Sequence, residues 1–203
     1  MPIKDYLTIA ECEKCQHRKR WRSLIVLIIS MVIPFWAASH IHYLTFVETL
    51  FAFVFLGIVA IIDMEYHAIL LKEIFVGIIL GLWIGIHHHG IWRTLAGGLL
   101  GFGMMFVLYY LGVWIQKLRN RQAQPGQYEE EALGFGDVNL MGVLGLFLGY
   151  PTVFGGLILG IISAGIFSLW VILKMLIQKN YRSQYAIPYG PFLILGALLL
   201  MLK

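Results

Sequence analysis

Two aspartates stand where long apolar segments of the sequence meet polar ones. Asp137 directly follows Gly134-Phe135-Gly136 and opens a glycine-rich apolar stretch, and Asp63 closes an earlier apolar stretch. Ionisable side chains at membrane depth are costly and are therefore usually functional. Two carboxyl groups a few ångströms apart share one proton, so one can act as a general base on water while the other polarises a peptide carbonyl. Such a pair would allow peptide hydrolysis without a metal or a covalent intermediate.

The same residues also have a simpler interpretation. An aspartate at the end of a membrane span is usually a solvated boundary residue, and Asp63 alone fits that description. Glu65 and Glu73 lie nearby, and we interpret them as solvated charges. Glu48 precedes Asp63 by 15 residues, or about 22 Å along a helix, which is too far for a third catalytic acid. Whether Glu48 pairs within the bundle or lies near the outer face stays open.

The composition indicates that the two aspartates are held by membrane-spanning helices. The chain has 203 residues, of which 60% are hydrophobic and 13% are charged. Its apolar runs approach the roughly 20 residues that a helix needs to cross a bilayer, and they are too continuous for the alternating strands of a barrel. We therefore predict an all-α polytopic helix bundle of about seven spans. These are expected at residues 23–40, 43–63, 71–87, 91–115, 137–150, 152–177 and 188–202.

The positions of the basic residues orient this bundle. With a cytoplasmic N-terminus, 13 of the 15 Lys and Arg residues fall in inner segments, and only Arg93 and Lys203 fall outside. This bias is what the positive-inside rule expects. In this topology Asp63 ends the second span and Asp137 begins the fifth span on the same, cytoplasmic side. The two carboxyl groups are therefore expected at similar depth.

The spans imply a simple division of the chain into two parts. Residues 1–22 are expected to form a short cytoplasmic N-terminal segment with a single Cys-x-x-Cys pair. Residues 23–203 are expected to form one transmembrane domain. Glycines recur in it at the spacing of helix–helix contacts, and we interpret most of them as packing sites. They are Gly77, Gly81, Gly85, Gly97, Gly101, Gly142, Gly145, Gly149, Gly156 and Gly160.

Three consecutive histidines, His87, His88 and His89, invite a metal-binding interpretation. Consecutive residues on a helix face different directions, and the sequence nearby offers no matching ligands. We therefore interpret the three histidines as part of a short outer loop.

Three blocks of the sequence resemble the type IV prepilin peptidases. Residues 134–140 (GFGDVNL) resemble the GxGD block of that family, and residues 61–63 (IID) are similar to its first aspartate block. Residues 187–193 (IPYGPFL) resemble its closing block. The GxGD block is shared with presenilins and signal-peptide peptidases, whereas the closing block is typical of the prepilin branch. The blocks occur in the family's order, from about residue 44 to the end of the chain.

This resemblance implies an intramembrane aspartic endopeptidase that removes the basic leader of type IV prepilins or pseudopilins at the cytoplasmic face. Asp63 and Asp137 match the catalytic aspartates. The implied supporting residues are Gly134, Gly136, Pro188, Gly190 and Pro191. The implied location is the cytoplasmic membrane of a prokaryote. The expected partners are the prepilin, the lipid bilayer and, as an open alternative, a second copy of the chain; no nucleic acid is expected.

Two residues near the aspartates depart from the family's pattern. Leu70 stands where the first block usually continues with proline, which predicts a looser turn after Asp63. Asn139 stands where a lysine is usual, which removes a positive charge close to Asp137. Neither change alters the two carboxyl groups.

The cysteines mark a larger departure. Full-length family members have a cytoplasmic domain with two Cys-x-x-Cys pairs and N-methyltransferase activity, whereas this sequence has only Cys12 and Cys15. Tetrahedral zinc takes four ligands, so even with His17 as a third ligand a partner chain would have to complete the site. We favour two reduced cytoplasmic thiols. The resemblance then implies a short, peptidase-only form that needs no cofactor for proteolysis.

Two other classes of function remain as alternatives. Intramembrane acids would serve equally well in a small proton- or cation-coupled transporter. The departures at Leu70 and Asn139 also allow a non-catalytic subunit of a pilus or secretion assembly, although the intact aspartates argue against it.

Overall fold

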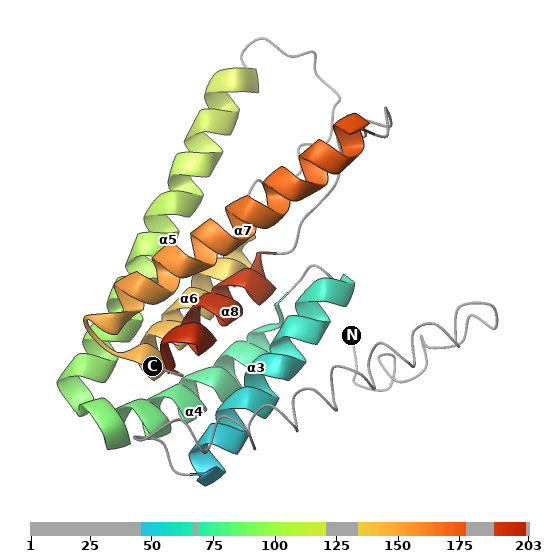
Figure 1. The fold of residues 1–203 in the computed structure, drawn as a ribbon. Coiled ribbons are helices and arrows are strands. Elements are labelled where there is room, and N and C mark those ends of the chain that lie inside the picture. Colours follow the sequence, from blue (N-terminus) through green and yellow to red (C-terminus); the bar gives the residue numbers. More distant parts are fainter. Residues whose placement is uncertain (1–45, 67–68, 121–133, 178–188, 202–203) are drawn as a thin grey trace.

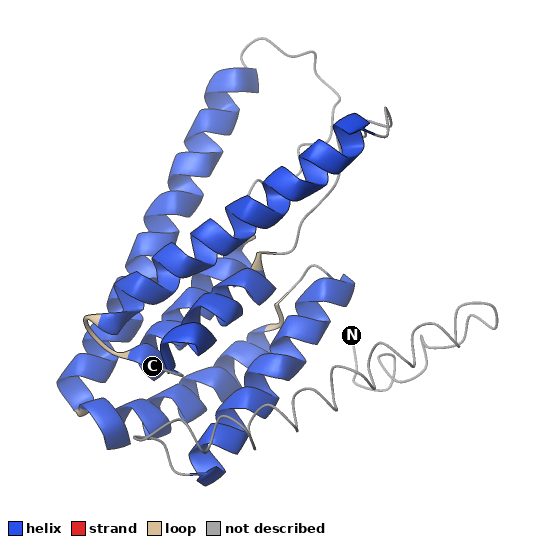
Figure 2. Cartoon of the chain, in the orientation of Figure 1, coloured by secondary structure: helices blue, strands red, loops and turns tan. Residues whose placement is uncertain are grey.

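The computed structural model describes residues 46–66, 69–120, 134–177 and 189–201, and in this part of the chain all regular structure is helical (Figure 2). The helices within these residues are α3 (Phe46–Tyr66), α4 (Leu71–His89), α5 (Ile91–Asn120), α6 (Phe135–Leu148), α7 (Thr152–Ile177) and α8 (Gly190–Met201). Helices α3, α4, α5 and α7 are long and apolar enough to cross a membrane, and α6 and α8 are shorter apolar helices. The predicted all-α membrane helix bundle is confirmed. The number of spans and the cytoplasmic N-terminus stay predictions.

The helices coincide with six of the seven predicted segments. The first segment, residues 23–40, and the N-terminal residues 1–22 lie outside the described residues. Some helices continue past the C-terminal bound of their segment: α5 continues to Asn120 and α3 to Tyr66. Hydropathy marks only the part of a helix that is surrounded by apolar material, whereas backbone hydrogen bonding continues into the polar residues beyond it.

The predicted loop at residues 87–89 is wrong, because these histidines form the last turn of α4. The connection to α5 is Gly90 alone, with φ 79° and its N–H donating to the Ile86 carbonyl at 3.1 Å. A residue at positive φ is the usual end of a helix, and glycine adopts it without steric cost. The helix therefore continues through its polar end until this glycine stops it.

Helix α6 forms the centre of the bundle. All of its residues from Val143 to Leu148 are buried, and it contacts α4, α5, α7 and α8. A helix that is apolar on every side is typical of such an enclosed position. Figure 1 shows α6 behind α7 and α8, covered from the viewer by both. Its short length therefore suits a helix that neighbouring helices surround.

Glycines let the helices approach α6 and α8 closely. A Cβ added at Gly145 would collide with the backbone carbonyl oxygen of Gly97 in α5, and one added at Gly101 would lie 2.5 Å from the Met141 oxygen. A Cβ at Gly196 of α8 would lie 2.5 Å from an α7 backbone oxygen. At Gly145 and Gly101 the predicted packing role is confirmed, and Gly196, which was not predicted, has the same role.

Helices α5 and α7 extend well past α6 and α8 at one end of the bundle (Figure 1). With 30 and 26 residues they measure about 45 and 39 Å, against about 21 and 18 Å for the 14 residues of α6 and the 12 of α8. The extended halves lie at the end where α6 and α8 begin. The starts of these two short helices are therefore flanked by longer ones.

Candidate active site

Asp63 lies in the last turn of α3 and is only 5% exposed. Its Oδ2 accepts a hydrogen bond of 3.0 Å from the backbone N–H of Gly190, the first residue of α8. The first N–H groups of a helix have no partner within the helix, so they are available to an acceptor such as this carboxyl group. Helix α8 thereby holds the Asp63 side chain in one orientation.

Gly190 is needed at this contact for steric reasons. A Cβ added there would lie 2.5 Å from Oδ2 and 3.0 Å from Cγ of Asp63. Real Cβ atoms essentially never approach a heavy atom to 2.5 Å. Any larger residue would therefore push α8 and the Asp63 carboxyl group apart.

Asp137 is the third residue of α6 and is 7% exposed. Its backbone N–H donates to the Gly134 carbonyl oxygen at 3.1 Å. Gly134 has φ −73° and ψ 141°, which any residue adopts, so unusual dihedrals do not explain this glycine. Close approach does explain Gly136, where an added Cβ would lie 3.0 Å from Cβ of Ile69. The first turn of α6 thus packs against the segment that follows α3.

The structure brings Asp63 and Asp137 together. Their carboxyl groups lie close enough for their charges to interact, although the two residues are 74 positions apart in the sequence. They come from the end of α3 and the start of α6, and the start of α8 lies at the same end of the bundle (Figure 1). Two neighbouring buried acids repel each other and lose hydration, so a fold keeps them at a cost to stability. Such an arrangement is typical of a functional site.

Residues 50–169, which include both aspartates, match the type IV leader peptidase family. The chain belongs to this family. It is also 22% identical to a prepilin leader peptidase/N-methyltransferase of Pseudomonas putida, over 97% of this chain and 64% of that protein. The chain therefore spans less than two thirds of this relative's length. No solved structure matches the chain.

In this member of the leader peptidase family, Glu73 is not the solvated charge that we expected from the sequence. Glu73 is half-buried, and its Oε2 accepts a hydrogen bond of 3.2 Å from the backbone N–H of Leu70. The N–H of Glu73 in turn donates to the Leu70 carbonyl oxygen at 3.0 Å. The interpretation of Glu73 as a solvated charge is therefore wrong, whereas Glu65 is exposed as expected.

The same contact explains how the family's usual proline can be absent. A proline at position 70 would have no N–H to donate, whereas Leu70 uses its N–H to bond Glu73 at the start of α4. These reciprocal hydrogen bonds hold residues 70–73 at the start of α4, whereas the looser turn expected after Asp63 includes residues 67–68, which lie outside the described residues. Asn139, the other departure, is half-buried in α6.

The remaining predicted site residues divide between two groups. Pro188, Cys12, Cys15 and His17 lie outside the described residues. Pro191 is half-buried in the first turn of α8, where a helix tolerates proline because the N–H that it lacks would have no partner within the helix.

Sequence reasoning included Gly190 only through the resemblance and missed its hydrogen bond to Asp63. A signal was present, since the pair Gly190-Pro191 before an apolar run is consistent with a helix start. The partner of that helix start lies 127 positions earlier, so no local pattern could name it.

Proposed function

We propose that this chain is an aspartic endopeptidase in which Asp63 and Asp137 together activate one water molecule. The observation that carries the proposal is the pair of buried, electrostatically interacting carboxyl groups within the segment that matches the leader peptidase family. One carboxylate takes a proton from the water, and the protonated partner donates its proton to the carbonyl oxygen of the scissile peptide. The resulting tetrahedral intermediate collapses when the leaving amine receives a proton from the pair.

The fold supports this chemistry by holding the two acids from different elements. The N–H of Gly190 orients the Asp63 carboxyl group, and the close contact of Gly136 with Ile69 fixes the first turn of α6. Catalysis by two side chains depends on their mutual position, which rigid helices maintain better than loops. In this mechanism neither a metal nor an organic cofactor takes part.

We propose that the substrate is a type IV prepilin or pseudopilin whose basic leader is removed at the cytoplasmic membrane face. The name of the Pseudomonas putida relative supports this substrate class, and the bias of basic residues supports the side of the membrane. The extended halves of α5 and α7 flank the end of the bundle that holds the aspartates (Figure 1). They offer a membrane-inserted substrate helix a surface to lie against. The proposal covers the peptidase activity alone, since that is the reaction two carboxyl groups can perform.

The test uses the purified full-length chain reconstituted into liposomes together with a prepilin-like peptide. Mass spectrometry of the products is expected to show a single cut that releases the basic leader. A proton-sensitive dye in the same vesicles tests the rival transporter. Proton flux without cleavage would replace the proposal by that rival, and the absence of both would favour the non-catalytic assembly subunit.

A further inference from the structure

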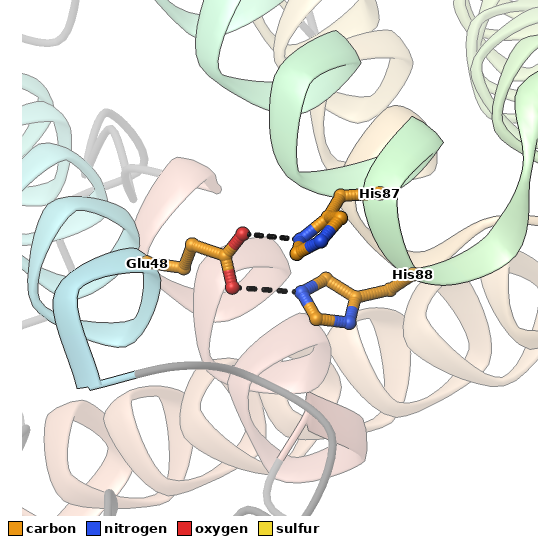
Figure 3. A group of neighbouring side chains, drawn as sticks. All are labelled: Glu48, His87 and His88. Atoms are coloured by element: carbon orange, nitrogen blue, oxygen red, sulfur yellow. Dashed lines mark hydrogen bonds and ion pairs between the residues drawn. The ribbon is translucent and has the colours of Figure 1, made fainter.

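A second group of ionisable side chains lies at the other end of α3 from Asp63. Glu48, in the first turn of α3, is 3% exposed. Its Oε1 lies 2.7 Å from Nδ1 of His87, and its Oε2 lies 2.8 Å from Nε2 of His88. Figure 3 shows the Glu48 carboxyl group pointing between the two imidazole rings at the end of α4. The question that the sequence left open is thereby answered, since Glu48 pairs within the bundle.

Two consecutive histidines can reach one carboxyl group because they use different ring nitrogens. Neighbouring side chains on a helix leave it about 100° apart, which was the reason for expecting no common site. His87 uses Nδ1, which is close to its backbone, whereas His88 uses the more distant Nε2. The two rings lie edge to face with their centroids 4.8 Å apart. The difference in reach compensates for the difference in direction.

A cation is one way to compensate the negative charge of Glu48. A carboxylate that is almost completely buried is costly unless a positive charge or several hydrogen bonds compensate it. Two imidazoles can supply that charge by taking up protons, or they can share a metal ion with the carboxylate. Both occupants use the same three side chains, so the experiment has to separate them.

We propose that Glu48, His87 and His88 bind a divalent transition-metal ion, and that Zn²⁺ fits them best. Two imidazole nitrogens and one carboxylate oxygen form a donor set that zinc binds in proteins, whereas Mg²⁺ and Ca²⁺ prefer oxygen ligands alone. One ligand atom from each residue can be chosen such that all three lie within 4.8 Å of one another. In a tetrahedral zinc site these separations would be about 3.3 Å, so small side-chain shifts suffice.

Metal binding also determines which nitrogen of each imidazole ring carries the hydrogen. An ionised Glu48 can only accept hydrogen bonds, so toward it Nδ1 of His87 and Nε2 of His88 each carry a hydrogen. To bind a metal, the same nitrogens must present their lone pairs, so in each neutral ring the proton moves to the other nitrogen. No net proton is lost from a neutral histidine in this exchange.

An ion and its remaining water ligands have access to the group. The His87 side chain is 60% exposed, whereas those of His88 and Glu48 are 12% and 4% exposed. A cavity of about 530 Å³ borders the carboxyl group. It is lined by Val47, Glu48, Leu82, Trp83, Ile86 and His87. The three side chains would thus hold the ion from one side and leave the other side to water.

This site is independent of the proposed peptidase chemistry. Glu48 precedes Asp63 by about 22 Å along α3, and neither aspartate belongs to the group. Its ligands come from α3 and α4, so a bound ion would join these two helices at the end away from the aspartates. The expected effect is therefore on the stability of the bundle.

The test measures zinc on the purified full-length chain carrying Cys12→Ser and Cys15→Ser, so that the two thiols cannot contribute, and without a polyhistidine tag. After incubation with Zn²⁺ and dialysis, elemental analysis is expected to find about one zinc per chain. Mg²⁺ at the same concentration is expected not to compete. The melting temperature is expected to rise with Zn²⁺. A protein without bound zinc, or with no change in melting temperature, would overturn the proposal and leave protonated histidines as the compensating charge.

Single substitutions in the same background locate the zinc. Glu48→Gln keeps the size and hydrogen bonding of the side chain but is a poor metal ligand, and His88→Ala removes one nitrogen; both are expected to lose the zinc. His89→Ala is the matched control, since the His89 ring lies against Gly149 and outside the group; it is expected to keep the zinc. Zinc retained by both ligand variants, or lost equally by the control, would overturn the assignment.

A further measurement does not depend on the folding of any variant. Co²⁺ bound by the two imidazoles and the carboxylate of the cysteine-free parent is expected to give visible absorption bands of a four- or five-coordinate ion. Absence of these bands would overturn the proposal even if Glu48→Gln and His88→Ala failed to fold.

Discussion

At the scale of single residues, the contact between Gly190 and Asp63 offers the sharpest prediction. In Gly190→Ala the new Cβ would have to occupy a position 2.5 Å from Oδ2 of Asp63, so the carboxyl group must shift. A displacement of about 1 Å in a catalytic group can lower the rate about 100-fold. We therefore expect Gly190→Ala to lose leader cleavage by about two orders of magnitude. The measurement is the cleavage rate of a prepilin peptide in detergent or liposomes.

Gly103→Ala is the matched control, because a Cβ added at Gly103 meets nothing within 4 Å. It should cleave at the rate of the parent chain. A Gly190→Ala protein as active as this control would show that the position of Asp63 relative to α8 does not matter for the reaction.

The sequence predicts the contacts of individual residues only in part. The sequence alone predicts that Asp63 and Asp137 lie at similar depth, because counting spans places both at the same membrane face. The bonds of Glu48 to His87 and His88 could not be predicted in this way, because they join residues 39 and 40 positions apart. Local patterns contain no information about which faces of two helices meet at such a distance.

At the scale of the elements, the contact of α5 with α6 depends on glycines. A Cβ at Gly97 would lie 2.7 Å from Cα of Gly149 and would collide with the Gly145 carbonyl oxygen, so the two helices would have to separate. Overpacking of this kind costs about 1 to 3 kcal/mol. We expect Gly97→Ala to lower the melting temperature of the purified protein.

Gly103→Ala lies on the same helix, α5, and faces open space. Replacing a helical glycine by alanine in such a position stabilises a helix by about 0.5 to 1 kcal/mol. The two alanine variants should therefore shift the melting temperature in opposite directions. Equal shifts would mean that helix propensity, rather than close approach, determines the effect.

The sequence predicts where the helices lie along the chain better than it predicts whether each helix faces lipid or other helices. Continuous apolar runs are required of helices in lipid, and all six described helices follow such runs. Hydropathy does not distinguish the buried α6 from a helix that faces lipid, because lipid tails are as apolar as the side chains of a protein core. The central position of α6 therefore emerges only from the packing of its neighbours.

At the scale of the whole molecule, the membrane orientation is the property that links the fold to the substrate. The basic residues predict that the α4–α5 connection faces outward and that the far end of α5 faces the cytoplasm. Trp92, which is 83% exposed, and the exposed Lys117 mark these two ends. In a cysteine-free background, Trp92→Cys should react with a membrane-impermeant maleimide added from outside to cells whose outer membrane has been opened.

Lys117→Cys should react only after the inner membrane has also been opened. The reverse pattern of labelling would place both aspartates at the outer face. It would thereby separate them from a leader that is removed in the cytoplasm.

The central claim is that Asp63 and Asp137 act together on one water molecule, and its most direct test is the cleavage rate of Asp63→Asn and of Asp137→Asn. Asparagine keeps the shape of each side chain but can neither take the proton of the water nor hold the shared one. With the purified, folded variants, we predict that each binds a prepilin peptide as the parent chain does and cleaves it no faster than the uncatalysed reaction. Cleavage by either variant at a rate near that of the parent chain would contradict the account.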